Sequence, residues 1–331
     1  MGIKKHVIFS VLTAACSLMV LSTRSTAVTY DDGGSYTSDT NIYEGIILRN
    51  GSSLDILPGA NIDKRWQDGK AGVYVLDSSV TMYGGSVIGE ASHYSKEATP
   101  GFEVWRSQLT IRAGNVSGGR ESSTGYNALP AIALKDKAKL AITGGVFSGS
   151  RGTQVGGYAL ELNNGSSATI HNGKFSGGGA YLNGKVNGNG GGGLRMFGGT
   201  VEVYGGMFNA VDSFQGSTAV SVGNQSHLSI YGGTFNSAVS LYPRCGNCSR
   251  FYGDLAIRTG VAAGYPGPVI NIFGGHINGD IGLDNLSILN VHGRGLSLKG
   301  ERLSGTLDDG SLIDILVYRW GEGAQINIIN R

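Results

Sequence analysis

A short unit built around paired glycines recurs through most of this 331-residue chain, and it limits the possible folds more than any other feature. One copy spans residues 227–235 and reads HLSIYGGTF. Its apolar residues alternate, then two glycines permit backbone angles that are closed to other residues, and an apolar position follows. The unit therefore predicts a strand, a tight corner and a second strand.

Copies of the unit return at a nearly constant interval. The second glycines from Gly85 to Gly199 are separated by 29, 31, 28 and 26 residues. An internal repeat of this length is typical of a solenoid, in which each coil stacks on the previous one. A second alternating segment precedes each copy, for example residues 73–75 and 102–104, so no room is left for helices. Parallel sheets formed by stacked coils are the expected result.

Stacking would place equivalent apolar residues in one column that no single coil could bury alone. The expected column contains Met82, Ile111, Ile142, Ile170, Met196, Val203, Ile230 and Ile272. Two intervals depart from the period. Gly199 and Gly206 are only 7 residues apart, which predicts a second corner inserted within one coil. Gly233 and Gly275 are 42 residues apart, which predicts a longer excursion.

In period and patterning, residues 46–298 resemble the right-handed parallel β-helix proteins. This pectin-lyase-like superfold is shared by pectate lyases, polygalacturonases, phage tailspikes and autotransporter passengers. The resemblance implies an all-β, single-domain right-handed parallel β-helix. We assign the β-helix to residues 28–302 and C-terminal β capping strands to residues 303–331, because an open coil edge invites pairing with other chains.

The first 27 residues have the features of an export signal. Lys4 and Lys5 precede an apolar run that ends at Leu21, and small residues lead to a cleavage site after Ala27. No later segment approaches about 18 consecutive apolar residues, so no membrane span is expected in the mature chain. We therefore predict an exported protein that is extracellular, on the cell surface or periplasmic.

Amino-acid composition further limits the classes of fold and of binding partner that are compatible with the chain. The chain has 57 glycines and 6 prolines without the Gly-X-Y period of collagen, which indicates a turn-rich β protein. Lysine and arginine total 26 against 24 acidic residues, a net charge of +2. This balance gives no indication of a nucleic-acid or anionic-membrane partner.

Two cysteines, Cys245 and Cys248, remain after removal of the signal. Exported proteins retain disulfides, so a short-range bridge between them is the preferred interpretation. A redox pair would need a helix that opens at the first cysteine, and a zinc site would need two further ligands nearby. The neighbouring sequence indicates neither, but both stay open as alternatives.

The residue that follows the inward column points outward, and in five of eight copies it is aromatic. These aromatic residues are Tyr83, Phe197, Tyr204, Tyr231 and Phe273. Exposed rings at a coil spacing of about 4.8 Å could stack against sugar rings or contact a partner protein. The alternative is structural, since aromatic residues suit strands and stabilise their neighbours along a ladder.

An enzyme would need paired acids within reach of one substrate. Glu103 and Glu161 occupy equivalent outward positions two coils apart, which stacking places about 9 to 10 Å from each other. Acids on strands are more often solvated or paired with a basic neighbour such as Lys135. The catalytic motif of polygalacturonases and the aspartate cluster of lyases are not found, and no histidine has a partner at ligand spacing. We predict no metal and no cofactor.

The sequence favours a non-enzymatic exported protein that binds a polysaccharide or another cell-surface component. A polysaccharide lyase, glycoside hydrolase or epimerase of the same fold is the second hypothesis. A purely structural matrix component is the third. Binding comes first because glycines and small polar residues fill the corners where catalytic charges would be expected.

Overall fold

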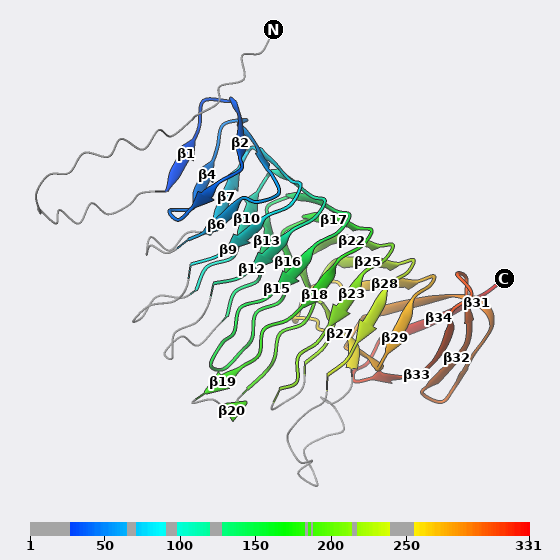
Figure 1. Ribbon diagram of the computed structural model, residues 1–331. Helices are drawn as coiled ribbons and strands as arrows, with labels where there is room; N and C mark the ends of the chain where they lie inside the picture. The colour runs from blue at the N-terminus through cyan, green and yellow to red at the C-terminus, as the bar shows by residue number, and fades with distance from the viewer. Residues whose placement is uncertain are drawn as a thin grey trace, which may run out of the picture.

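The computed structural model describes residues 27–64, 71–90, 98–119, 128–182, 185–186, 188–213, 217–238 and 255–331. In these ranges the regular elements are strands, with no α-helix, and they stack into the elongated solenoid of Figure 1. Three long parallel stacks of strands, which we call sheets A, B and C, run along it and confirm a parallel β-helix. Residues 1–26 of the predicted signal peptide, and Cys245 and Cys248, lie outside the described residues, so the signal and the disulfide stay predictions.

Each of the first nine coils contributes one strand to each sheet, and the last two contribute to sheets A and B only. Sheet A contains β1 (Val28–Tyr30), β4 (Ile46–Leu48), β7 (Val73–Leu76), β10 (Phe102–Trp105), β13 (Ile132–Lys135), β16 (Leu160–Asn163), β21 (Leu194–Phe197), β24 (Val220–Val222), β27 (Leu255–Thr259), β30 (Asp280–Leu283) and β33 (Leu312–Arg319). Sheet B contains β2 (Ser35–Ser38), β5 (Ser53–Ile56), β8 (Ser79–Met82), β11 (Gln108–Ile111), β14 (Lys139–Ile142), β17 (Ser167–Ile170), β22 (Gly199–Val203), β25 (Ser226–Ile230), β28 (Val269–Ile272), β31 (Ile288–Lys299) and β34 (Gln325–Asn330). Sheet C contains β3 (Asn41–Ile42), β6 (Asn61–Asp63), β9 (Ser86–Ile88), β12 (Asn115–Ser117), β15 (Val146–Ser148), β18 (Lys174–Ser176), β23 (Met207–Asn209), β26 (Thr234–Asn236) and β29 (His276–Asn278). The remaining strands are the small hairpin β19 (Tyr181–Leu182) and β20 (Lys185–Val186), and the cap strand β32 (Arg302–Leu307).

The three connections within a coil differ in length. From β8 to β29, the corner between sheets B and C has three residues in every coil, such as residues 204–206 and 231–233. The connection from sheet C back to sheet A ranges from one residue, Gly279, to the eighteen residues 237–254. The variable spacing of the glycine pairs therefore comes mainly from one edge of the solenoid.

The inward residues of sheet B form the predicted apolar column, and each pairs in register with its counterpart in the next coil. The column runs through Ile56, Met82, Ile111, Ile142, Ile170, Val203, Ile230, Ile272 and Val291, all fully buried. Burial of these side chains by neighbouring coils stabilises the stack, at about 25 cal/mol for each Å² of apolar surface removed from water. The prediction is confirmed for every member but one.

Met196 is the exception. It lies on β21 in sheet A, paired with Leu162 and Val222, because Gly198 and Gly199 form the corner from sheet A to sheet B. Other coils have this same corner and build it from residues such as Asn164, whose φ is +52°. The 7-residue interval to Gly206 therefore reflects a glycine-rich version of a regular corner, not an inserted one.

Sheet C carries a column of its own inside the solenoid. Its phenylalanine rings stack with centroid separations of 4.6, 4.7 and 5.0 Å, and none is exposed to solvent. These rings belong to Phe147, Phe175, Phe208 and Phe235. We call them the inner stack.

The C-terminal end of the solenoid is closed by antiparallel strands. β31 continues past sheet B, pairs with β32 from Gly293 onward, and β32 pairs in turn with β33. The inward residues Leu303, Leu307 and Ile313 are buried against the last coil. β34 then returns to sheet B and pairs in parallel with β31.

Candidate functional site

The corner between sheets B and C needs glycine for two different reasons. A Cβ atom on the first glycine would meet the coil below, at 2.5 Å from the carbonyl oxygen of His171 for Gly205 and at 2.6 Å from that of Tyr204 for Gly232. The second glycine has a positive φ, +101° at Gly206 and +102° at Gly233. Close stacking and a left-handed turn thus explain the Gly-Gly pair that recurs in the sequence.

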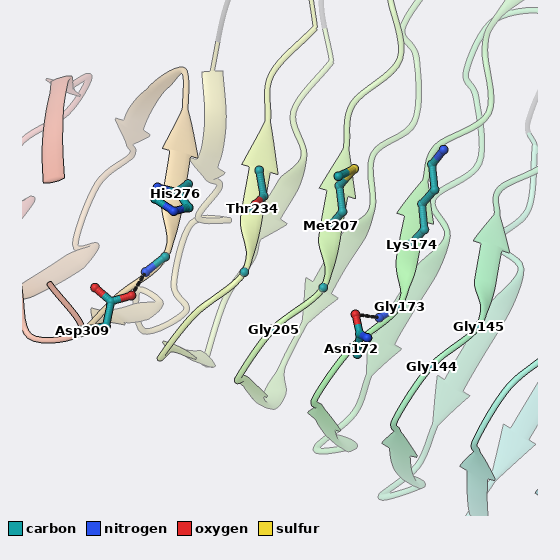
Figure 2. Close-up of a pocket in the computed structure, with 13 residues that line it drawn as sticks. Gly144, Gly145, Asn172, Gly173, Lys174, Gly205, Met207, Thr234, His276 and Asp309 are labelled. Carbon is teal, nitrogen blue, oxygen red and sulfur yellow. Dashed lines mark hydrogen bonds between the residues drawn. The ribbon is translucent and has the colours of Figure 1, made fainter. Parts of the chain in front are cut away.

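A groove runs over these corners along the solenoid axis. Its volume is about 640 Å³, and its lining comes from five consecutive coils. Glycine backbone forms its floor, and one wall consists of the first residues of β18, β23, β26 and β29. Figure 2 shows these wall residues, Lys174, Met207, Thr234 and His276, side by side on neighbouring strands.

Backbone amides of the second glycines are hydrogen-bond donors in this groove. The N–H of Gly275 donates to Oδ2 of Asp309 (2.7 Å), and the N–H of Gly173 donates to Oδ1 of Asn172 (2.8 Å) (Figure 2). Gly206 and Gly233 lie between them, with φ values within a few degrees of the +97° of Gly275. Within the described ranges neither amide has an acceptor. The groove therefore offers free donors at successive coils, at a spacing of about 4.8 Å.

Asp309 closes one end of the groove. It comes from the turn between β32 and β33, and its carboxylate accepts hydrogen bonds from Gly275, from the N–H of Ser311 (2.9 Å) and from the Ser311 hydroxyl (2.6 Å). Burial on its own would raise the pKa of Asp309, but the hydrogen bonds from Ser311 and Gly275, together with the charge of His276, outweigh it and lower the pKa. The groove thus holds an ionised carboxylate at this end.

A ladder of rings lies outside sheet B, just before the glycine pairs. Stacked neighbours have centroid separations of 5.0, 4.9, 4.8 and 4.2 Å. The rings belong to His171, Tyr204, Tyr231, Phe273 and His292, which we call the outer stack. Because each ring covers the face of the next, their edges and the tyrosine hydroxyls face solvent, while the faces are largely occupied.

The other predicted aromatic residues have different surroundings. Tyr83 lies in the same column as the outer stack but three coils below His171, and the Arg112 guanidinium lies 5.0 Å from the centre of its ring. Phe197 does not belong to the column, for the same reason as Met196: it ends β21 in sheet A and is paired with Asn163. The guanidinium of Arg195 lies 4.8 Å from its ring centre.

Polar side chains continue the outer surface of sheet B beside the outer stack. The carboxamide of Asn271 donates to Ser229 (3.4 Å), and those of Asn290 and Asn327 each donate to the carboxamide oxygen of the preceding asparagine (2.8 Å). Tyr204 has its hydroxyl 3.5 Å from Glu202. From Ser229 to Asn327 this row of side chains is polar, and the coils hold it in register.

Glu103 and Glu161 lie two coils apart on the outward side of sheet A, as predicted, with Ala133 between them. Glu103 forms an ion pair with Lys135 (2.7 Å), and Glu161 forms one with Arg195 (2.5 Å). Both carboxylates thus have basic partners, and both belong to a different sheet from the groove.

The groove residues were not predicted from the sequence. Three wall residues directly follow a glycine pair, and Lys174 follows Asn172-Gly173. These positions mark the outward start of each strand in sheet C, but the sequence pattern predicted only a corner there. Among the described residues, no group of three or more His, Cys, Asp or Glu side chains could hold a metal ion, and no helix has the length and apolar character needed to cross a membrane. Comparison with protein-family models, curated proteins and solved structures finds no match to this chain.

Proposed function

We propose that this chain is an exported protein of the pectin-lyase-like β-helix superfold that binds a polysaccharide chain along the groove over its Gly-Gly corners, without cleaving it. The observation that carries the proposal is the groove itself, in which five successive coils present the same corner to one elongated space. A repeating site of this kind suits a repeating polymer, since each coil can contact an equivalent part of the ligand.

The chemistry of the lining supports a ligand rich in hydroxyl groups. The amides of Gly206 and Gly233 are donors, and Lys174, Thr234 and His276 add polar side chains on one wall. Hydroxyl oxygens both accept and donate, so one sugar chain could pair with all of these groups. The outer stack does not line the groove, and its ring faces are engaged with one another, so it offers a ligand only ring edges and hydroxyls beside the groove.

The position of the acids supports binding over cleavage. Glu103 and Glu161 are on sheet A, away from the groove, and each is held by a basic residue. The acid at the groove, Asp309, is engaged by three hydrogen bonds. An acid that acts in glycoside cleavage has to reach the glycosidic oxygen, and among the described residues that line the groove Asp309 is the only acid.

The test is a panel of purified polysaccharides, with binding and the release of reducing or unsaturated ends measured in the same samples. We expect binding without products. Lys174→Ala should weaken it by about 1 kcal/mol, roughly fivefold in Kd, since one hydrogen bond is lost. Lys139→Ala is the matched control, an exposed lysine on β14 outside the groove, and should bind as the parent does.

Three results would contradict the proposal. Absence of binding to every polysaccharide would leave a structural or protein-binding solenoid as the better account. Product release would show that the chain is an enzyme. Equal losses for Lys174→Ala and Lys139→Ala would place the ligand elsewhere on the surface.

A further inference from the structure

The C-terminal end of sheet B has an unpaired strand edge. β34 pairs with β31, and its backbone amides of Gln325 and Arg331 donate to the carbonyls of Ser287 and Gly293. Successive residues of a strand direct their backbone groups to opposite edges, so the N–H and C=O groups of Ile326 and Ile328 point away from β31. In the described part of the chain no strand pairs with that edge.

β34 lacks the features that usually protect an edge strand. Its sequence, QINIIN, has no charge, proline or glycine, and it is rich in β-branched residues. The cap strand β33 lies at the same end (Figure 1) and exposes Leu312, 76% accessible, and Leu316. An uncharged edge beside exposed leucines is a surface suited to pairing with another chain.

The N-terminal end of sheet B has the complementary edge. β2 pairs with β5 alone among the described strands, and the carbonyls of Gly34 and Ser38 accept from β5. The backbone groups of Ser35 and Thr37 therefore point to the open side. Tyr30 and Tyr36 stack at 4.0 Å and only partly cover the core at this end.

We propose that copies of this protein associate head to tail, with β34 of one copy pairing in parallel with β2 of the next. The unpaired N–H and C=O groups belong to alternate residues of β34 and of β2. They lie opposite one another in the same way as the groups that pair any two neighbouring coils. In the register that continues the sheet, Asn327 meets Thr37, whose hydroxyl can donate to the Asn327 carboxamide oxygen. The Nδ2 of Asn327 is already engaged with Asn290 (2.8 Å), so the ladder of carboxamides ends on an acceptor.

Charge favours head-to-tail contact over contact between two N-terminal ends. Residues 28–48 contain four acids, Asp31, Asp32, Asp39 and Glu44, and no lysine, arginine or histidine. Two such ends would repel each other. At the opposite end, Arg319 is the last residue of β33, and Arg331, which pairs with Asp308 (3.5 Å), directly follows β34. A contact between unlike surfaces does not close on itself, so repeated association would extend the solenoid into a filament.

The experiment uses one edge variant for each end in the protein purified after export. Thr37→Pro removes the N–H of β2 that points to the open side, and Ile329→Asp on β34 places a carboxylate opposite Asp39 of the next copy. Analytical ultracentrifugation over a wide concentration range should show growing oligomers for the parent and monomers for either variant alone. An equal mixture of the two variants should form dimers and nothing larger, because each copy keeps one competent end. Thr110→Lys, an outward position inside sheet B, should assemble like the parent.

The outcomes are decisive in both directions. A parent protein that stays monomeric at every concentration would overturn the proposal, as would assembly by either edge variant alone or a mixture that forms no dimers. Circular dichroism and thermal melting of each variant would establish that the β-helix is retained. Electron microscopy of the parent should show filaments one solenoid wide, and wider bundles made by edge-blocked variants would indicate lateral association instead.

Discussion

Two stacks of aromatic rings flank three consecutive corners, residues 171–173, 204–206 and 231–233, one inside the solenoid and one outside, and their geometry is nearly the same. Neighbouring rings are 4.6 to 5.0 Å apart in the inner stack and 4.2 to 5.0 Å apart in the outer stack. Their burial differs: Phe208 is inaccessible, whereas Tyr204 is 45% and Tyr231 is 37% exposed. The coil spacing imposes the stacking in both cases, so burial and not ring geometry should decide what each stack contributes to stability.

The largest loss of stability is expected for a substitution in the inner stack. Phe208→Ala would leave a cavity between Phe175 and Phe235 and should lower the free energy of unfolding by about 3 to 5 kcal/mol. Chemical denaturation followed by circular dichroism would measure the loss. Phe208→Leu, which keeps most of the volume, is the control and should lose less. If Phe208→Ala cost no more than a substitution in the outer stack, burial would not be the deciding factor.

The second largest loss of stability is expected for a substitution in the corner between the two stacks. A methyl group on Gly205 would lie 2.5 Å from the His171 carbonyl, a backbone atom that cannot move without shifting a coil. We expect Gly205→Ala to cost about 1 to 3 kcal/mol, as for other overpacked sites. Gly260→Ala is the matched control, since a Cβ there meets nothing within 4 Å. Equal melting temperatures for these two variants would disprove the close-approach explanation.

A smaller effect is expected in the outer stack. Tyr231→Ala removes the ring contacts with Tyr204 and Phe273, and we expect a loss of about 0.5 to 1.5 kcal/mol in the free energy of unfolding. Tyr231→Phe keeps both contacts and should unfold like the parent. A loss as large as that of Phe208→Ala would show that the outer rings are part of the core in energetic terms.

The smallest effect is a pH dependence confined to the outer stack. Burial lowers the pKa of His292 below its ordinary value of 6.5, Arg331 lowers it further, and Asp308 opposes the shift. The unfolded chain then binds a proton more readily than the folded one, so stability should be complete above pH 6.5 and fall as the pH drops through the folded pKa. Melting temperatures measured across this range should decline less for His292→Phe. If the melting temperature declined equally in His292→Phe and in the parent, His292 would not be the source of the pH dependence.

The fold could be predicted from the sequence because the same period appears in every coil. Alternation fixed which residues of sheet B face inward, and seven of the eight predicted column members are in place. Met196 and Phe197 were misplaced because the corner before β22 is built from Gly198 and Gly199 and so mimics the glycine pair of the next corner. A local pattern does not distinguish two corners that use the same residues.

The groove could not be predicted from the same pattern. Its floor consists of backbone, and the amides of Gly206 and Gly233 have no side chain that would reveal their role. The alternation of apolar and polar residues predicts on which side of a strand a side chain lies. It does not predict which corner of the coil forms a groove. Asp309 closes the groove from a turn more than thirty residues beyond Gly275, and only the folded cap brings the two together.

The constant three-residue corners and the variable return connections have a consequence for the evolution of this protein. Residues inserted or deleted between sheets C and A alter one edge of the solenoid and leave the register of sheets B and C unchanged. That edge can therefore change in length while the corners that form the groove keep their geometry. Duplication of a whole coil would add one equivalent set of residues to the groove. The length of polymer that the groove can contact would then change by one coil at a time.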